Sequence, residues 1–431
     1  MINIQSHREF NAAAHLPSRA RLAGSNTSIF TEQRVVIGII LASICYQAVL
    51  CLLNTQIHIA SRAIVGVSEG LIILACLPIL ARRLMTGVIM LILLTSGLLV
   101  LSSLLSGELN IKSIRDILIP LVFFWVGCNI GKPELAEKGL IVAIAVVLIF
   151  GFFELFFVDT FTRFFDIFGY YVSTGNLAPI TDYVRESKLQ MNGIRPEGIG
   201  RTLLPSLLGS HRVSSVFLEP ISMGNFATMC AAWGFSKDTS KTREMVLFVG
   251  AAVVMMVLAD SRFALMAVSL MAAARIFLKG NLVNVAIFAP FAAILLLLVL
   301  GLDTTGRGED SFHGRLAFSG FTLMQFDIPM IFGATGFHNF ADQGYAYVIS
   351  SFGLPACLLL WASLWLVRMP DDQGTRFRAF AAIYFSLILC ISGNSAFAFK
   401  SAAVLWLLLG CCMRTPAPVR QSNNPEDLRH A

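Results

Sequence analysis

The residues of this chain that could do chemistry are gathered in a polar stretch that begins at His211. Arg212, Ser214, Ser215 and Glu219 follow within it, directly before a long apolar segment. Charged side chains at the edge of a bilayer are costly, and a function or a partner usually holds them there. We therefore interpret this stretch as part of a site, with Arg212 as its cation. The alternative is an interfacial arginine that only fixes a helix end.

The spacing within this stretch predicts a polar helical face. Ser215 and Glu219 are four residues apart, so a helix would place them on the same side. Pro220 interrupts helical hydrogen bonding just beyond them. Because polar, irregular backbone at membrane depth is tolerated where it lines a cavity, we expect a cavity here.

A second arginine, Arg262, follows Asp260 and Ser261 at the expected outer turn of a helical hairpin. An Arg212–Arg262 pair would suit a diphosphate, because guanidinium groups bind phosphate oxygens in a bidentate manner. The alternative is a turn in which Asp260 neutralises Arg262.

His338 and Arg315 are the candidates in a second polar segment. His338 lies close to Gly336 and Asp342, just before an apolar run. Histidine can take a proton near neutral pH, and a carboxylate such as Asp342 could orient it. Arg315 could contact an anion, and it belongs to a short interfacial helix expected at about residues 314–326.

Other polar residues are expected to have structural rather than chemical roles. Glu69 and Lys400, inside apolar runs, are expected to be paired or to reach the membrane surface. The nine cysteines show no CxxC or Cys/His spacing, which argues against disulfides and a metal site. Nucleotide-binding and hydrolase motifs are absent. We expect no metal, no cofactor and no nucleic-acid partner, and chemistry at the outer face.

Membrane-spanning helices must position these residues. Hydrophobic residues make up 56% of the 431-residue chain and charged residues only 13%, about half the charged fraction of an ordinary soluble protein. Most apolar runs are close to the ~20 residues that a helix needs to cross a bilayer. The sequence therefore predicts an all-α polytopic integral membrane protein with about twelve transmembrane helices.

Lysine and arginine recur on one side of the expected spans. By the positive-inside rule, the tails at residues 1–34 and 414–431 face the cytoplasm. Residues 35–413 form a single transmembrane domain with two large outer loops, at about 159–213 and 303–344. The spans are expected at residues 35–54, 64–81, 86–106, 114–131, 139–158, 214–235, 245–259, 263–278, 282–302, 345–367, 377–393 and 397–413.

Three motifs resemble those of the Wzy-type polysaccharide polymerases and the related O-antigen ligases of bacterial inner membranes. With the number of helices, the resemblance covers about residues 35–413. A narrower resemblance is to the polymerases of xanthan-like exopolysaccharides. The motifs are Arg212-x-Ser-Ser-x-Phe-x-Glu-Pro-x-x-x-Gly-Asn-Phe226, Ser261-Arg262 at a helix start, and Gly336-x-His338-Asn339-x-x-Asp342-x-Gly344-Tyr345 with Gly353-Leu354 behind it.

The resemblance implies a GT-C-like, inverting and metal-independent glycosyltransferase at the periplasmic face of the inner membrane. Its substrate would be an undecaprenyl-diphosphate-linked oligosaccharide, and chain-length regulators and export proteins would be its partners. Polymerases of this kind join repeat units into O-antigen or exopolysaccharide, whereas ligases transfer the glycan to lipid A–core. In the ligase pattern a glycine is expected sooner after the histidine than Gly353 follows His338 here. This longer spacing favours a polymerase over a ligase.

The resemblance also implies roles for the candidate residues. Arg212 and Arg262 would hold the donor diphosphate. His338, with Asp342, would orient or deprotonate the acceptor hydroxyl, and Glu219 is an alternative base or an orienter of Arg212. An alternative of another class is a flippase or other transporter of lipid-linked oligosaccharide. A transporter should carry its polar residues near the bilayer midplane on broken helices, whereas here they are expected at outer helix ends.

Overall fold

The described part of the protein is built from helices. The computed structural model describes residues 19–108, 110–177, 188–189, 193–194, 201–303, 311–336, 338, 340 and 342–413, with side chains from residue 32 onward apart from that of residue 207. Within this part, the pairing between extended segments is an isolated β-bridge of Ile194 with His211. The predicted all-α class is confirmed.

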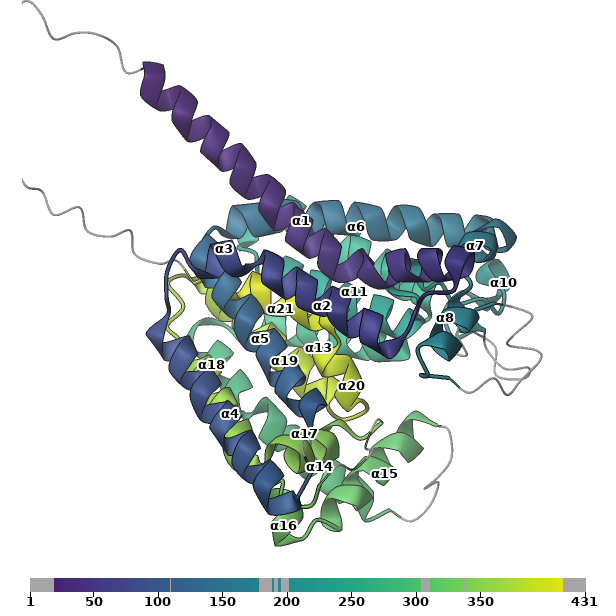
Figure 1. The fold of residues 1–431 in the computed structure, drawn as a ribbon, viewed down its shortest axis with the longest axis vertical. Helices are drawn as coiled ribbons and strands as arrows, with labels where there is room; N and C mark the ends of the chain where they lie inside the picture. Colours follow the sequence, from purple (N-terminus) through teal and green to yellow (C-terminus); the bar gives the residue numbers. More distant parts are fainter. Residues whose placement is uncertain are drawn as a thin grey trace, which may run out of the picture.

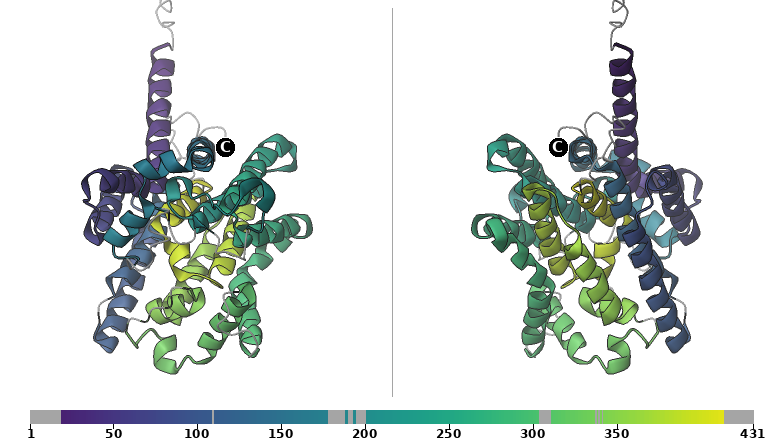
Figure 2. Two further views of the ribbon diagram at one scale, coloured as in Figure 1. Left: turned by 90° about the vertical axis from the view of Figure 1, so that its right-hand side faces the viewer. Right: turned by 90° about the vertical axis from the view of Figure 1, so that its left-hand side faces the viewer.

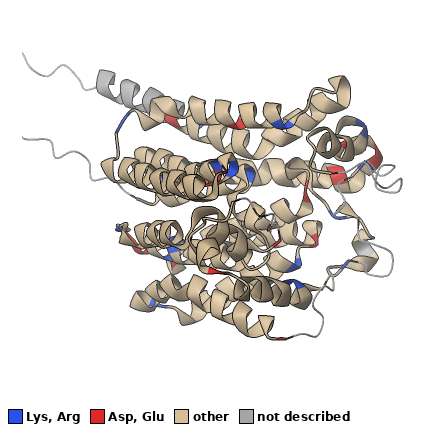
Figure 3. Ribbon diagram, turned by 60° about the horizontal axis from the view of Figure 1, so that its bottom comes forward, with Lys and Arg blue, Asp and Glu red and all other residues tan. Residues whose placement is uncertain are grey.

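Seven stretches of the described part are long and apolar enough to cross a membrane. Figure 3 shows that much of the helical ribbon carries no charged residue. Helices of this length and hydropathy confirm a membrane-embedded protein. They are α1 (Arg19–Ile57), α2 with α3 (Arg62–Ala75 and Leu77–Leu80), α4 (Thr86–Ser106), α5 (Ile111–Ile130), α6 (Pro133–Phe156), α12 (Thr242–Ala259) and α14 (Ala289–Gly301), the last two preceded by 3-10 turns at Thr239–Lys241 and Gly280–Phe288.

An eighth apolar stretch is broken in two. α17 (Gly344–Phe352) and α18 (Leu354–Leu366) meet at an angle of 105°. Gly353 stands at the break with φ +77°, and a Cβ there would lie 2.7 Å from the carbonyl oxygen of Phe332. Only glycine fits both the left-handed backbone and this close approach. The single span expected at residues 345–367 is therefore a bent pair.

Four further helices are shorter than a full span and lie inside the bundle or against it. α11 (Pro220–Ser236) is central, because every residue in it except Ile221 is buried. α13 (Arg262–Phe277), α19 (Asp372–Ile388) and α21 (Phe399–Cys411) pack around it. Four of the expected spans coincide with these helices, which are shorter than a full span. The predicted number of about twelve transmembrane helices and the predicted GT-C-like arrangement therefore stay predictions.

α5 and α21 pack with their backbones in contact. A Cβ on Gly127 would lie 2.3 Å from the carbonyl oxygen of Leu407, and one on Gly410 would lie 2.2 Å from that of Phe124. Small residues that allow such close approach are a common way for helices to associate in membranes. This pair fixes the last helix, which carries Lys400, against the middle of the bundle.

Several short helices connect the longer ones. α7 (Val158–Phe164), α8 (Ile167–Ser173), α10 (Pro205–Leu208), α15 (Phe312–Met324) and α16 (Ile328–Ile331) lie at the right and bottom of Figure 1, whereas α1 begins at the upper left. Figure 2 shows α1 extending beyond the bundle. This helix already begins at Arg19, within the tail expected at residues 1–34. The tail predictions for residues 1–18 and 414–431 fall outside the described residues.

Candidate functional site

The turn between α12 and α13 is the best-defined polar position among the expected site residues. Asp260 adopts the left-handed conformation (φ +46°), and Ser261 caps α13 with its side chain. The Asp260 side chain is fully buried, and its Oδ1 accepts hydrogen bonds from the N–H groups of Thr202 and Leu203 at 3.0 and 2.9 Å. The end of the first polar segment is thereby fixed to this turn.

Two buried arginines satisfy the carbonyl groups at the end of α12. Arg212 is 6% exposed, and its Nε donates to the carbonyl oxygen of Ala259 at 3.1 Å. Arg201 is 5% exposed, and it donates to the carbonyl oxygens of Leu258, at 3.2 Å, and of Val257. The last carbonyls of a helix lack helical partners and carry partial negative charge, so cations are stabilising there. Arg212 therefore has a structural role at this turn, whatever else it binds.

Arg262 is exposed at this turn, whereas Arg212 is buried. Arg262 is the first residue of α13, and its Nε donates to the hydroxyl of Thr202 at 2.6 Å. The structure thus brings the two expected arginines to one turn, with Arg212 beneath it and Arg262 on its surface. An anion that approached this turn would meet Arg262.

A buried carboxylate that the sequence analysis did not single out holds the polar stretch in place. Glu154, near the end of α6, is 0% exposed. It accepts hydrogen bonds from His211 at 3.1 Å, from both the N–H and the hydroxyl of Ser214 at 3.0 Å, and from the N–H of Ser215 at 2.5 Å. A lone carboxylate inside an apolar run was the signal that could have identified it.

The prediction that Ser215 and Glu219 lie on the same face of a helix is wrong. Ser215–Phe217 form a 3-10 turn, η2, and both Ser215 and Leu218 have positive φ, +52° and +59°. α11 begins at Pro220, because proline fits the first turn of a helix better than its interior. Ser215 points inward and donates to the carbonyl oxygen of Val147 at 2.7 Å, whereas the Glu219 side chain is 27% exposed.

Glu219 is paired with Lys400 across the bundle. The Lys400 ammonium lies 3.5 Å from Glu219 Oε2 and donates to the carbonyl oxygen of Phe217 at 2.8 Å. Ser222 donates to the same Glu219 oxygen at 2.8 Å. The expectation that Lys400 is paired is confirmed, and its partner is a candidate site residue.

A second polar cluster lies within the membrane-spanning helices. The Tyr46 hydroxyl donates to Glu69 at 2.7 Å, and Arg115 lies 3.7 Å from the other Glu69 oxygen. Arg115 also donates to Asp116 at 2.9 and 2.7 Å, and the Tyr347 hydroxyl donates to Asp116 at 2.6 Å. Tyr46 lies three turns before the end of α1 at Ile57, about 16 Å along the helix axis. The cluster therefore reaches deep into the bundle, and the expected pairing of Glu69 is confirmed.

Gln47 joins this cluster to the Glu219–Lys400 pair. Its Nε2 donates to the Tyr46 hydroxyl at 3.2 Å, and its Oε1 accepts from Lys400 at 3.1 Å. Side chains of α1, α2, α5, α17 and α21 and the start of α11 thus form one continuous polar network. Partners in such a network come from distant parts of the chain, so sequence spacing does not reveal them.

The candidates of the second polar segment lie apart from the α12–α13 turn. His338 Nδ1 is 3.3 Å from the carbonyl oxygen of Gly336, and its ring stacks on Phe340 with centroids 5.6 Å apart. Asp342 is exposed, and so is Arg315 on α15, the interfacial helix expected at residues 314–326. Figure 1 places α15 at the lower end of the molecule.

The structure therefore brings only some of the expected residues together. Ser261, beside Arg262, packs against Gly224 so closely that a Cβ on this glycine would lie 2.4 Å from the Ser261 hydroxyl. Gly224 lies just over one turn after Glu219 in α11. Within the described ranges, no hydrogen bond or ion pair links His338 or Asp342 to Arg212, Arg262 or Glu219.

The described side chains include no group of three or more His, Cys, Asp or Glu residues placed to hold a metal ion. No protein-family model matches the sequence, and a search of curated proteins finds no significant match.

Proposed function

We propose that the protein is a glycosyltransferase that polymerises undecaprenyl-diphosphate-linked oligosaccharide repeat units at the periplasmic face of the inner membrane. The observation that carries this proposal is the α12–α13 turn, where exposed Arg262 stands over buried Arg212. A fixed guanidinium group is suited to binding a diphosphate, and it would stabilise the charge that develops as the diphosphate leaves.

The transfer is a displacement at the anomeric carbon of the donor sugar. The acceptor hydroxyl oxygen forms a bond to this carbon, while the bond from the carbon to the diphosphate oxygen breaks. The hydroxyl proton passes to a base, and the diphosphate leaves on its lipid. Glu219 and His338, with Asp342 beside it in sequence, are the candidate bases, and Arg315 is a further candidate cation.

The geometry favours Glu219 over His338 as the partner of this turn. Glu219 is part-exposed, is held by Lys400 and Ser222, and precedes the segment of α11 that packs on Ser261. A carboxylate fixed by hydrogen bonds is preorganised for orienting a hydroxyl group or accepting its proton.

A second candidate function is transport of lipid-linked oligosaccharide. Two observations favour it: the polar network that extends from Glu219 to Tyr347 within the helices, and the bent helix pair α17–α18. Polar residues on broken helices at membrane depth are typical of transporters.

The deciding experiment uses a deletion strain complemented with Arg262→Ala, Glu219→Gln or His338→Ala. For a polymerase, Arg262→Ala leaves single repeat units on the lipid carrier, accessible to glycosidases from the periplasmic side. For a transporter, the same units accumulate where added glycosidase does not reach them. Polymer that is made on its carrier but not joined to lipid A–core would indicate a ligase. Normal polymer from all three variants would refute the proposed site.

A further inference from the structure

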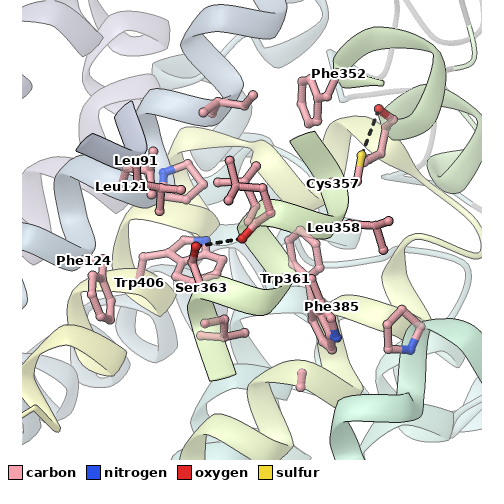
Figure 4. Close-up of a pocket in the computed structure, with 18 of the residues that line it drawn as sticks. Leu91, Leu121, Phe124, Phe352, Cys357, Leu358, Trp361, Ser363, Phe385 and Trp406 are labelled. Carbon is pink, nitrogen blue, oxygen red and sulfur yellow. Dashed lines mark hydrogen bonds between the residues drawn. The ribbon is translucent and has the colours of Figure 1, made fainter. Parts of the chain in front are cut away.

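A cavity of about 560 Å³ lies within the helix bundle. Figure 4 shows Trp361, Phe385 and Trp406, from α18, α19 and α21, lining the same space. The polar side-chain atoms of two lining residues, Cys357 and Ser363, are hydrogen-bonded to the backbone. Cys357 donates to the carbonyl oxygen of Val348, and Ser363 donates to that of Leu359. The surface that remains is apolar and suited to hydrocarbon.

The lining residues of the outermost helices are themselves exposed. Leu94 on α4 is 53% exposed, Phe291 on α14 48% and Leu358 on α18 45%. In a membrane, such side chains contact lipid. A hydrocarbon chain can therefore enter between these helices without crossing a polar surface.

One end of the cavity is flanked by cations. Met85, at the start of α4, and Val367, at the end of α18, line this end. Arg83 precedes Met85 by two residues, and Arg368 follows Val367 directly. Both arginines are exposed, and within the described part of the chain neither forms an ion pair with a carboxylate.

The opposite end is bounded by the polar network. Ile117 and Val348 line the cavity there, and the residues before them, Asp116 and Tyr347, are joined by a hydrogen bond of 2.6 Å. The ammonium of Lys112 lies 4.5 Å from the centre of the Tyr347 ring. The basic mouth of the cavity is thus on the side where α4 begins, away from this bond.

We propose that the cavity binds one acyl chain of an anionic phospholipid, with the phosphate of the headgroup at Arg83 and Arg368. The apolar lining takes the chain, and the two exposed arginines give the preference for negative charge. A basic residue near a membrane surface contributes about fivefold to binding of an anionic lipid. The site is separate from the α12–α13 turn and does not depend on the function proposed for that turn.

The test is native mass spectrometry of the full-length protein, released from nanodiscs that hold equal amounts of phosphatidylglycerol and phosphatidylethanolamine with the same acyl chains. Arg83→Gln with Arg368→Gln removes the headgroup contacts, and Arg243→Gln, an exposed arginine at the start of α12, is the control. Gly87→Phe fills the cavity, because Gly87 lines it and a Cβ there meets no atom within 4 Å. Gly250→Phe on α12, equally open but outside the cavity, is its control.

We expect the unaltered protein to retain phosphatidylglycerol over phosphatidylethanolamine by about 20-fold. The double arginine variant should retain both lipids equally, and Gly87→Phe should lose both at least tenfold, while the two controls behave like the parent. Ser363→Phe is a second filling variant if Gly87→Phe does not fold. Unchanged lipid retention in the filling variants would overturn the site, and unchanged selectivity in the arginine variant would overturn the headgroup assignment. Displacement of the phospholipid by added undecaprenyl diphosphate would reassign the cavity to the carrier chain and refute this proposal.

Discussion

The ammonium group of Lys400 lies 3.5 Å from the carboxylate of Glu219, although the two residues are 181 positions apart. The Lys400 side chain is 5% exposed. Burying a charge is costly unless it is paired and hydrogen-bonded. Lys400 meets this requirement by also donating to the carbonyl oxygen of Phe217 and to Gln47. The contact joins the last helix of the described chain to the start of the central one.

Replacing Lys400 by methionine should destabilise the protein by about 3 kcal/mol, because it leaves Glu219 without its cation and the carbonyl oxygen of Phe217 without its donor. Lys400→Arg, which keeps the charge and donors, should cost less. Thermal unfolding of the purified protein in detergent, followed by tryptophan fluorescence, measures both.

Lys237 offers a matched control for this prediction. It is a buried lysine at the opposite end of α11, paired with Glu137 and with Glu244, the latter at 3.1 Å. Lys237→Met should lower stability in a similar way. Unlike Lys400→Met, it should leave polymer formed per folded molecule unchanged, because its partners are not candidate site residues. If Lys400→Met unfolds at the same temperature as the parent, the pair does not support the fold.

Glu154→Gln should destabilise the protein by about 2–3 kcal/mol, because the buried carboxylate accepts hydrogen bonds from His211, Ser214 and Ser215 that are stronger with a charged acceptor. The amide group of glutamine can replace only part of them. The loss should also loosen residues 211–215, which faster amide hydrogen exchange of that stretch would show. Asp159→Asn, an exposed acid in α7, should change stability by less than about 0.5 kcal/mol. Equal effects of the two substitutions would contradict this role of Glu154.

The fold class could be predicted from the sequence because an apolar run of about 20 residues fits the thickness of a bilayer. The helix start at Ser261-Arg262 and the interfacial helix around Arg315 could also be predicted, since both carry local signals. The bend at Gly353 could not, because the run from 345 to 367 is apolar on both sides of it and only tertiary contact with Phe332 requires the glycine.

The site could be predicted only in part. The sequence indicated Arg212, Arg262 and Glu219 as polar residues at helix ends, and these lie on elements that pack together. It did not indicate the observed partners of Glu219 and Arg262, because Lys400 and Thr202 approach them through packing of distant segments. The interpretation of Arg212 as an anion-binding residue competes with its contact to the end of α12, which no local pattern reveals.

Replacing Arg212 should lower the stability of the protein, whereas replacing Arg262 should mainly lower its activity. Arg212→Ala should cost about 2–3 kcal/mol, because the buried carbonyl oxygen of Ala259 loses a charged donor. Arg262→Ala should change stability by less than about 1 kcal/mol, since the side chain is exposed, yet reduce polymer formation by about 10²-fold or more. Unfolding temperatures and polymer length in the complemented deletion strain measure the two effects. A loss of stability in Arg262→Ala equal to that in Arg212→Ala would contradict the assignment.

Gly127→Ala tests the contact between α5 and α21. The added methyl group would lie 2.3 Å from the carbonyl oxygen of Leu407, so the helices must move apart. Overpacking of this kind costs about 1–3 kcal/mol. Gly97→Ala on α4 is the control, because a Cβ there meets no atom within 4 Å. Unfolding midpoints of the two variants should therefore differ by several degrees, and equal midpoints would show that α5 and α21 can separate freely.

Tyr347→Phe tests whether the polar network in the bundle stabilises the protein through its hydrogen bond between Tyr347 and Asp116. Its hydroxyl donates to the buried carboxylate of Asp116 at 2.6 Å, and a hydrogen bond to a charged group contributes about 1.5–3 kcal/mol. Tyr384→Phe is the matched control, because Tyr384 is equally buried and its hydroxyl has no hydrogen-bond partner among the described residues. Removing that hydroxyl should be neutral or stabilising, since a buried polar group without a partner is costly. Opposite shifts in unfolding temperature for the two variants are the expected result. A shift of the same sign and size in both would mean that the Asp116–Tyr347 bond contributes no more than an unpartnered hydroxyl, and that the network is held by packing alone.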